Sequence, residues 1–139
     1  MAATPTERLR AILGERGVPA PPAKLLDGEE EGTLLLTRRL RNATHLDVDQ
    51  LDRRLRALLL DNPAAERHLH HEMDFSEATP ADPDGEATLD LQEAWDNVRP
   101  TLEVRLRGAP TEAELAAVAA VCEAYVAAIA KVFPLTARH

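Results

Sequence analysis

The stretch from residue 111 to residue 133 constrains the fold more than any other part of the chain. Between Leu115 and Ala130 the only charged side chain is Glu123. A helix on the surface of a soluble protein normally presents charged residues on its outer face. We therefore expect a helix that is covered on more than one side, either by the rest of the chain or by a second subunit.

This predicted helix has one face of large apolar residues and one face of alanines. Thr111 and Glu114 form a capping box ahead of it. The large residues recur at spacings of three and four, and they are Leu115, Val118, Cys122, Tyr125, Ile129 and Val132. This face is suited to packing on a sheet. The alanine face is either a run of strong helix formers or a surface for close contact with a second helix, from this chain or from a homo-oligomer. Its residues are Ala117, Ala120, Ala124 and Ala128.

Apolar patterns also predict the other elements. Alternate leucines indicate a strand from residue 33 to about residue 42, and residues 101–107 show the clearest alternation in the chain. A stripe with helical spacing predicts a helix that Asp47 caps and that ends near residue 60. We do not expect Pro100 inside a central strand, because proline cannot donate a backbone hydrogen bond.

Two segments are less distinct. Residues 63–75 favour a short helical turn followed by a strand from about residue 68. Residues 88–98 fit either a strand or a short helix. With a short helix over residues 5–16, the order of elements predicts an α+β fold. We expect a small, mostly antiparallel sheet of three or four strands, with two main helices on one face.

The domain organisation follows from composition. We assign residues 1–18 to an N-terminal helical arm, residues 19–32 to a Pro/Glu-rich linker and residues 33–139 to a single α+β domain. The arm either moves independently or docks on the domain through Leu9 and Leu13.

Charge and cysteine content exclude several classes of function. The net charge of −8 argues against a dedicated binder of nucleic acid or of anionic membranes. A single cysteine, Cys122, excludes an internal disulfide and is typical of a reducing cytoplasm. The N-terminus lacks the apolar segment of a signal peptide, so we expect a cytoplasmic protein. Two lysines against fourteen arginines indicate coding in a GC-rich, actinobacterial-like genome, so arginine is a weak functional signal here.

Residues 66–74 hold the densest group of side chains that can bind a metal. In a helix, Glu66, His70 and Asp74 would share one face; in a strand, the shared face would hold His68, His70, Glu72 and Asp74. Imidazole and carboxylate groups are ordinary ligands of divalent metals. His71 belongs to the same cluster. A solvated polar face is the simpler interpretation, and histidines beside acids are also typical of pH sensing.

Two further charged groups stand out. The segment from Glu72 to Val98 contains nine acidic residues and no lysine or arginine. We expect either a solvated loop or a contact with a basic partner, with Asp82, Asp84 and Glu86 as its candidate residues. The arginines between residues 38 and 56 would either grip a phosphate or carboxylate or pair with neighbouring acids.

No grouping of side chains identifies a reaction or a phosphate loop. We therefore predict a small acidic cytoplasmic accessory protein that acts through protein–protein interaction, as a regulator, adaptor or immunity-like protein. We expect no catalytic activity of its own and no cofactor. The predicted partners are another protein, basic in character, and further copies of this chain, rather than nucleic acid or membrane. The alternative is a small-molecule or divalent-metal binding protein, enzymatic or not, that uses the cluster at residues 66–74.

Overall fold

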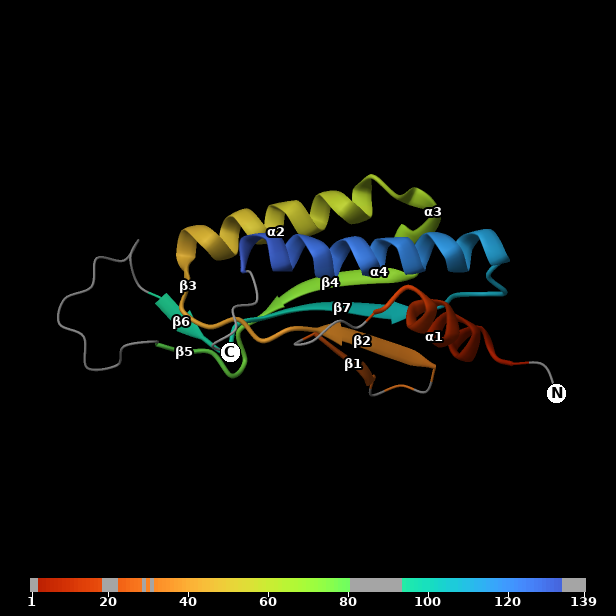
Figure 1. The fold of residues 1–139 in the computed structure, drawn as a ribbon, viewed down its shortest axis with the longest axis horizontal. Helices are drawn as coiled ribbons and strands as arrows, with labels where there is room; N and C mark the ends of the chain where they lie inside the picture. The colour runs from red at the N-terminus through yellow and green to blue at the C-terminus, as the bar shows by residue number, and fades with distance from the viewer. Residues whose placement is uncertain (1–2, 19–22, 29, 31, 81–93, 134–139) are drawn as a thin grey trace.

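The protein has an α+β fold in which helices cover one face of an antiparallel sheet (Figure 1). The computed structural model describes residues 3–18, 23–28, 30, 32–80 and 94–133. The elements are α1 (Pro5–Glu15), β1 (Lys24–Asp27), β2 (Thr33–Thr37), β3 (Ala43–Thr44), α2 (His45–Leu60), α3 (Pro63–Glu66), β4 (Leu69–Asp74), β5 (Thr79–Pro80), β6 (Ala94–Asp96), β7 (Arg99–Arg105) and α4 (Glu112–Val132). The main sheet has the order β1-β2-β7-β4, and a smaller sheet has the order β3-β6-β5. Every pairing is antiparallel.

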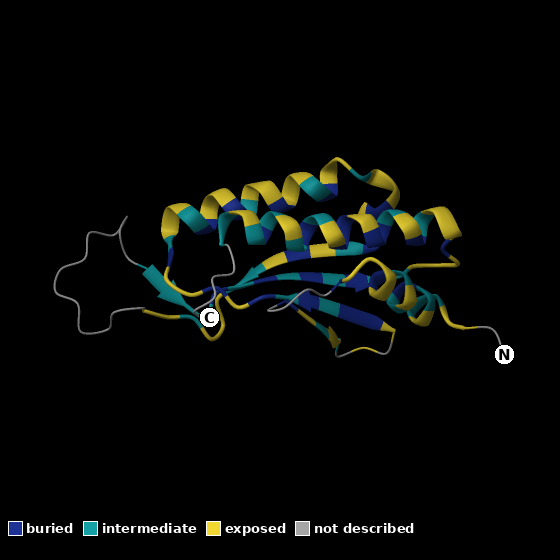
Figure 2. Ribbon diagram, viewed as in Figure 1, coloured by how far each residue is buried: buried dark blue, intermediate teal, exposed yellow. Residues whose placement is uncertain are grey.

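The long helix α4 lies at the centre of the helical layer. The predicted capping box is present: the Thr111 hydroxyl accepts from the Glu114 N–H, and the Glu114 carboxylate accepts from the Thr111 N–H. The large apolar face is buried, as Figure 2 shows along the side of α4 that meets the sheet. Helices α1, α2 and α3 each pack against α4. The same chain therefore supplies cover for α4 beyond the sheet, while Ala116, Ala120 and Ala127 stay exposed.

This position also accounts for the hydropathy of α4. By length and composition α4 is the one helix among the described residues that is apolar enough to cross a membrane. Its sheet-facing side belongs to the same hydrophobic core as β2 and β7. The apolar character of α4 is thus that of a core helix in a soluble-type domain. A cytoplasmic location stays a prediction.

Strand alternation gives the main sheet two different faces. In the register of β2 and β7, Leu34 lies opposite Val104 and Leu36 lies opposite Leu102. These side chains are fully buried against the helices. The alternate residues, such as Leu35 opposite Glu103, point to the other face. We call this second surface the open face, because the helices lie on the opposite side of the sheet.

The N-terminal region packs against the rest of the chain. Leu9 and Leu13 of α1 are 0% exposed, so the helical arm is docked on the body of the domain. The expected linker of residues 19–32 contains strand β1, which pairs with β2 along its whole length. The Pro/Glu-rich composition around β1 conceals it, because the strand is short and its stability comes from the neighbouring strand.

Helix α2 begins earlier than expected. Its N-cap is Thr44, whose hydroxyl accepts from the Asp47 N–H, and Asp47 lies in the first turn. The predicted strand at residue 33 ends at Thr37, before the expected end near Asn42. The short helix and following strand predicted within residues 63–75 are confirmed as α3 and β4. Of residues 88–98, positions 88–93 lie outside the described residues, and Ala94–Asp96 form β6.

Pro100 lies inside β7, which has β2 on one side and β4 on the other. The prediction that Pro100 would not lie in a central strand is therefore wrong. The Arg105 N–H donates to the His68 carbonyl at 2.8 Å. The backbone N–H groups of successive residues in an antiparallel strand point alternately to its two neighbours. The N–H of Arg105 points toward β4, so the nitrogen of Pro100, five residues earlier, points toward β2. The pairing of β2 stops at Thr37, opposite Thr101, one residue before Pro100 would need a partner. The proline therefore costs no ladder hydrogen bond and marks the end of β2.

Candidate binding face

Strand β4 separates the three clustered histidines. His71 points to the helical layer, and His70, the preceding residue, points to the open face and is exposed. His68 lies just before the strand and is buried on the helical side. Successive residues of a strand face opposite sides. The cluster that is contiguous in the sequence is thus divided between the core and the surface.

His71 joins three elements through its ring. Its Nε2 lies 2.7 Å from Oδ1 of Asp52 on α2, and its Nδ1 lies 2.7 Å from the hydroxyl of Tyr125 on α4. The carboxylate can only accept, so Nε2 carries the proton and Nδ1 accepts from the tyrosine. Arg56 binds the same carboxylate at 2.9 Å. The network connects β4, α2 and α4 in one place.

Burial is the main cause of the pKa shifts of His71 and Tyr125 in this network, but not of that of Asp52. It lowers the pKa of His71, against the opposing effect of the Asp52 carboxylate, and it raises the pKa of Tyr125. Burial alone would raise the pKa of Asp52, but hydrogen bonds from Arg56 and His71 outweigh it and lower that pKa. At neutral pH the histidine is therefore neutral between an ionised acid and a neutral phenol.

His68 makes a second connection of the same kind. Its Nδ1 accepts from the Arg107 N–H at 2.9 Å, so its Nε2 carries the proton and donates to Glu114 at 2.7 Å. Arg67 binds the same carboxylate at 2.6 Å. The hydrogen bond from His68, and then that from Arg67, lowers the pKa of Glu114 to about 2. The start of β4 is thus attached to the first turn of α4.

The structure does not bring the predicted metal ligands together. Glu66 is exposed on α3, His68 and His71 are buried on the helical side, and His70 and Asp74 lie on β4 facing the other way. Within residues 3–18, 23–28, 30, 32–80 and 94–133, no group of three or more His, Cys, Asp or Glu residues lies close enough to hold a metal ion. Of the two predicted arrangements, the extended one places His70, Glu72 and Asp74 on one face.

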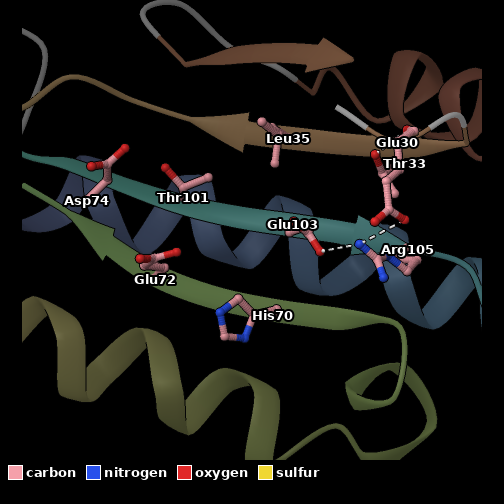
Figure 3. A pocket seen from close by; sticks show the side chains of 9 residues that line it. All are labelled: Glu30, Thr33, Leu35, His70, Glu72, Asp74, Thr101, Glu103 and Arg105. Carbon is pink, nitrogen blue, oxygen red and sulfur yellow. Dashed lines mark hydrogen bonds and ion pairs between the residues drawn. The ribbon is translucent and has the colours of Figure 1, made fainter. Parts of the chain in front are cut away.

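Those three residues line a shallow hollow on the open face. Figure 3 shows Leu35 on one side of it, His70 and Glu72 on the other, and Glu103 of the central strand between them. The hollow has a volume of about 270 Å³. Its lining consists of Glu30, Thr33, Leu35, His70, Glu72, Asp74, Thr101, Glu103 and Arg105.

The hollow is acidic. Its lining includes four carboxylates and one arginine. Arg105 is already engaged, at 3.1 Å from Glu30 and 3.6 Å from Glu103. Asp74 accepts from the Ser76 N–H, and hydrogen bonding to Ser76 lowers its pKa. Glu72 is exposed and has no ion pair among the described residues. Arg99 lies opposite Asp74 in the strand register and its charge also lowers the pKa of Asp74, so Glu72 is the acid on the β4 side of the hollow that has no charged partner among the described residues.

The opposite side of the open face is apolar. Leu26 of β1 lies directly opposite Leu35 of β2 in the strand register, so the two side chains share this face. Leu26 is 46% exposed, and Leu35 beside it is half-buried. The open face thus has a leucine pair at one edge and carboxylates at the other.

The arginines predicted as one basic patch have separate roles. Arg38 is buried, and its Nη2 donates to the C-cap carbonyl of α4 at 2.6 Å. A cation at this end of a helix is favourable, although burial lowers the pKa of Arg38. Arg53 and Arg56 pair with acids one turn earlier on α2. Arg38, Arg53 and Arg56 therefore have partners within the fold, while Arg39, Arg41 and Arg54 are exposed.

The candidate interaction residues have different outcomes. Ala120 is exposed on α4, whereas Ala117, Ala124 and Ala128 are half-buried beside the neighbouring elements. A homo-oligomer through this face stays a prediction. Asp82, Asp84 and Glu86 lie outside the described residues.

Sequence reasoning missed the roles of His68, His71 and Asp52. One signal was present: Tyr125 lies in the apolar stripe of a core helix, and a buried phenol normally needs a hydrogen-bond partner. That requirement predicts a polar group on a facing element without showing which one.

No protein-family model, no curated protein and no solved structure matches this chain.

Proposed function

We propose that this protein is a non-catalytic accessory protein that binds a basic segment of another protein on the open face of its sheet. The observation that supports this proposal most directly is the hollow, which is lined by four carboxylates and a single arginine that is already paired. Such a protein would act as a regulator, an adaptor or an immunity-like protein.

The position of the other titratable groups supports a binding role rather than catalysis. The side chain of His71 is 1% exposed and that of His68 is 0% exposed. Both rings use their two nitrogens in contacts within the fold. These histidines hold strand β4 against the helices, and they are separated from the hollow by the sheet itself. Binding at the open face would consequently depend on its shape and charge, without a contribution from these two histidines.

The proposal is tested with a capped hexalysine peptide, titrated into the protein at low ionic strength by isothermal calorimetry. We expect Glu72→Lys to weaken binding on the order of tenfold, because it replaces an attractive charge in the hollow with a repulsive one. The matched control is Asp61→Lys, at an exposed acid at the end of α2. Both variants change the net charge equally, so only a local effect separates them. Equal weakening by the two variants, or no binding by the unaltered protein, would contradict the proposal.

A further inference from the structure

The open face restricts the backbone conformation of what can bind there. The order β1-β2-β7-β4 places β2 and β7 between neighbouring strands, so their backbone groups are used within the sheet. A segment lying on the face meets side chains only. Its own N–H and C=O groups must then be satisfied internally, because a buried and unpaired backbone group costs about 1–3 kcal/mol. A helix meets this requirement in a single segment.

The dimensions of the face also suit a helix. Neighbouring strands are about 4.8 Å apart, so the distance from the β1 edge to β4 is roughly 14 Å. A helix with its side chains is about 10–12 Å wide. One helix lying along the strands therefore contacts the leucine pair with one side and the carboxylates with the other.

The spacing of the carboxylates sets the spacing of the partner's cations. Glu72 and Asp74 both lie on the open face of β4, two residues apart. Two residues of a strand span about 6.8 Å. Positions i and i+4 of a helix are about 6 Å apart along its axis. Two cations separated by one helical turn thus match the two acids.

We propose that the open face binds an amphipathic helix with two adjacent stripes. An apolar stripe of leucine-sized residues packs on Leu26 and Leu35, and a stripe of lysines or arginines at i and i+4 lies over Glu72 and Asp74. This inference rests on the proposed function and adds the conformation and residue pattern of the partner. It is carried by the charge of the hollow together with the exposed Leu26 and the half-buried Leu35 beside it.

The experiment compares two capped peptides of identical lysine, leucine and alanine composition. In the first, the lysine and leucine stripes are adjacent on a helix; in the second, the same residues are reordered so that each stripe is interrupted. Calorimetry measures affinity, and circular dichroism measures helix formation on binding. We expect the striped peptide to bind about tenfold more tightly, and to become helical as it binds. We expect Leu26→Asp and Leu35→Asp each to remove most of this advantage. Circular dichroism of each variant alone confirms that it is folded.

The outcomes separate the two proposals. If both peptides bind equally and Glu72→Lys weakens both, the partner is recognised by charge alone; the helix inference is then overturned and the proposed function stands. If neither peptide nor hexalysine binds, both are overturned. If light scattering instead shows a protein dimer that Leu26→Asp dissociates, the occupant of the face is a second copy of this chain, and the helix inference is again overturned.

Discussion

The same substitution at the two adjacent histidines of β4 should destabilise the protein at His71 and have little effect at His70. His71→Leu removes both hydrogen bonds of the buried ring, and leaves the Tyr125 hydroxyl without its partner. His70→Leu changes a residue on the open face that is exposed. The two positions are adjacent on the same strand, so the comparison tests the side of the sheet on which each ring lies.

The size of the effect follows from the groups that lose partners. A hydrogen bond to a charged group contributes about 1.5–3 kcal/mol, and an unsatisfied buried hydroxyl costs about 1–3 kcal/mol. Leucine restores part of the lost apolar packing, so we expect His71→Leu to lower the free energy of unfolding by about 3 kcal/mol. Unfolding entropy is about 2.1 cal/mol/K per residue, or roughly 0.29 kcal/mol/K for 139 residues. The expected fall in Tm is therefore roughly 10 °C.

Urea denaturation followed by circular dichroism, with thermal scans in parallel, measures both variants. We expect His70→Leu to remain within about 0.5 kcal/mol of the unaltered protein, as surface substitutions usually do. Equal losses for the two variants, or a larger loss for His70→Leu, would refute the assignment of His71 to the core and His70 to the open face.

Three further predictions concern pH, packing and assembly. The fold lowers the pKa of His71, so below its ordinary value of 6.5 the unfolded chain binds more protons than the folded chain. The free energy of unfolding therefore decreases as the pH is lowered below 6.5. The fold also lowers the pKa of Glu114 from 4.5 to about 2, so stability decreases further below pH 4.5. Urea denaturation midpoints measured across pH should show that His71→Leu removes the decrease that begins near pH 6.5 and keeps the one below pH 4.5. Gly28→Ala should lose about 1–3 kcal/mol in urea denaturation, because the new Cβ would collide with the Thr33 side chain, whose Cβ lies 3.0 Å away. In contrast Gly14→Ala, in open space within α1, should gain about 0.5–1 kcal/mol. For the predicted homo-oligomer, light scattering should show a dimer that Ala120→Glu dissociates; a monomer at high concentration would exclude it.

The elements that follow from local sequence were predictable. The capping box at Thr111 and the regular spacing of Leu115, Val118 and Cys122 specify α4 within a few residues, because both signals act within one or two turns. Strand β4 was also predictable, since alternation of Leu69, His71 and Met73 is a local pattern.

The features that depend on distant partners were not predictable. Strand β1 forms because β2 lies beside it, and nothing in its own composition distinguishes it from a linker. His71 contacts Asp52 and Tyr125, which are 19 and 54 residues away, so their meeting is a property of the tertiary structure. Pro100 is tolerated only because β2 ends opposite its neighbour, and that depends on strand register.

The candidate site was predictable in part for the same reason. The acidic character of residues 72–98 is visible in the sequence, and Glu72 and Asp74 do lie in the hollow. The same surface also includes Glu103, Arg105 and Leu35, which come from other strands. Their position there can be predicted only when the order of strands in the sheet is known. The pairing of Leu26 with Leu35 on this face requires the register as well.

Nuclear magnetic resonance of the isotopically labelled protein, titrated with the striped peptide, tests the binding role of the open face most directly. The account predicts that the largest amide shift changes occur at residues of β4 and β7 around Glu72 and Glu103, together with Leu26 and Leu35 on the apolar side. Amides on the outer side of α4, such as that of Ala120, should change little. Changes confined to the outer surfaces of α2 and α4, with the sheet unaffected, would contradict the account.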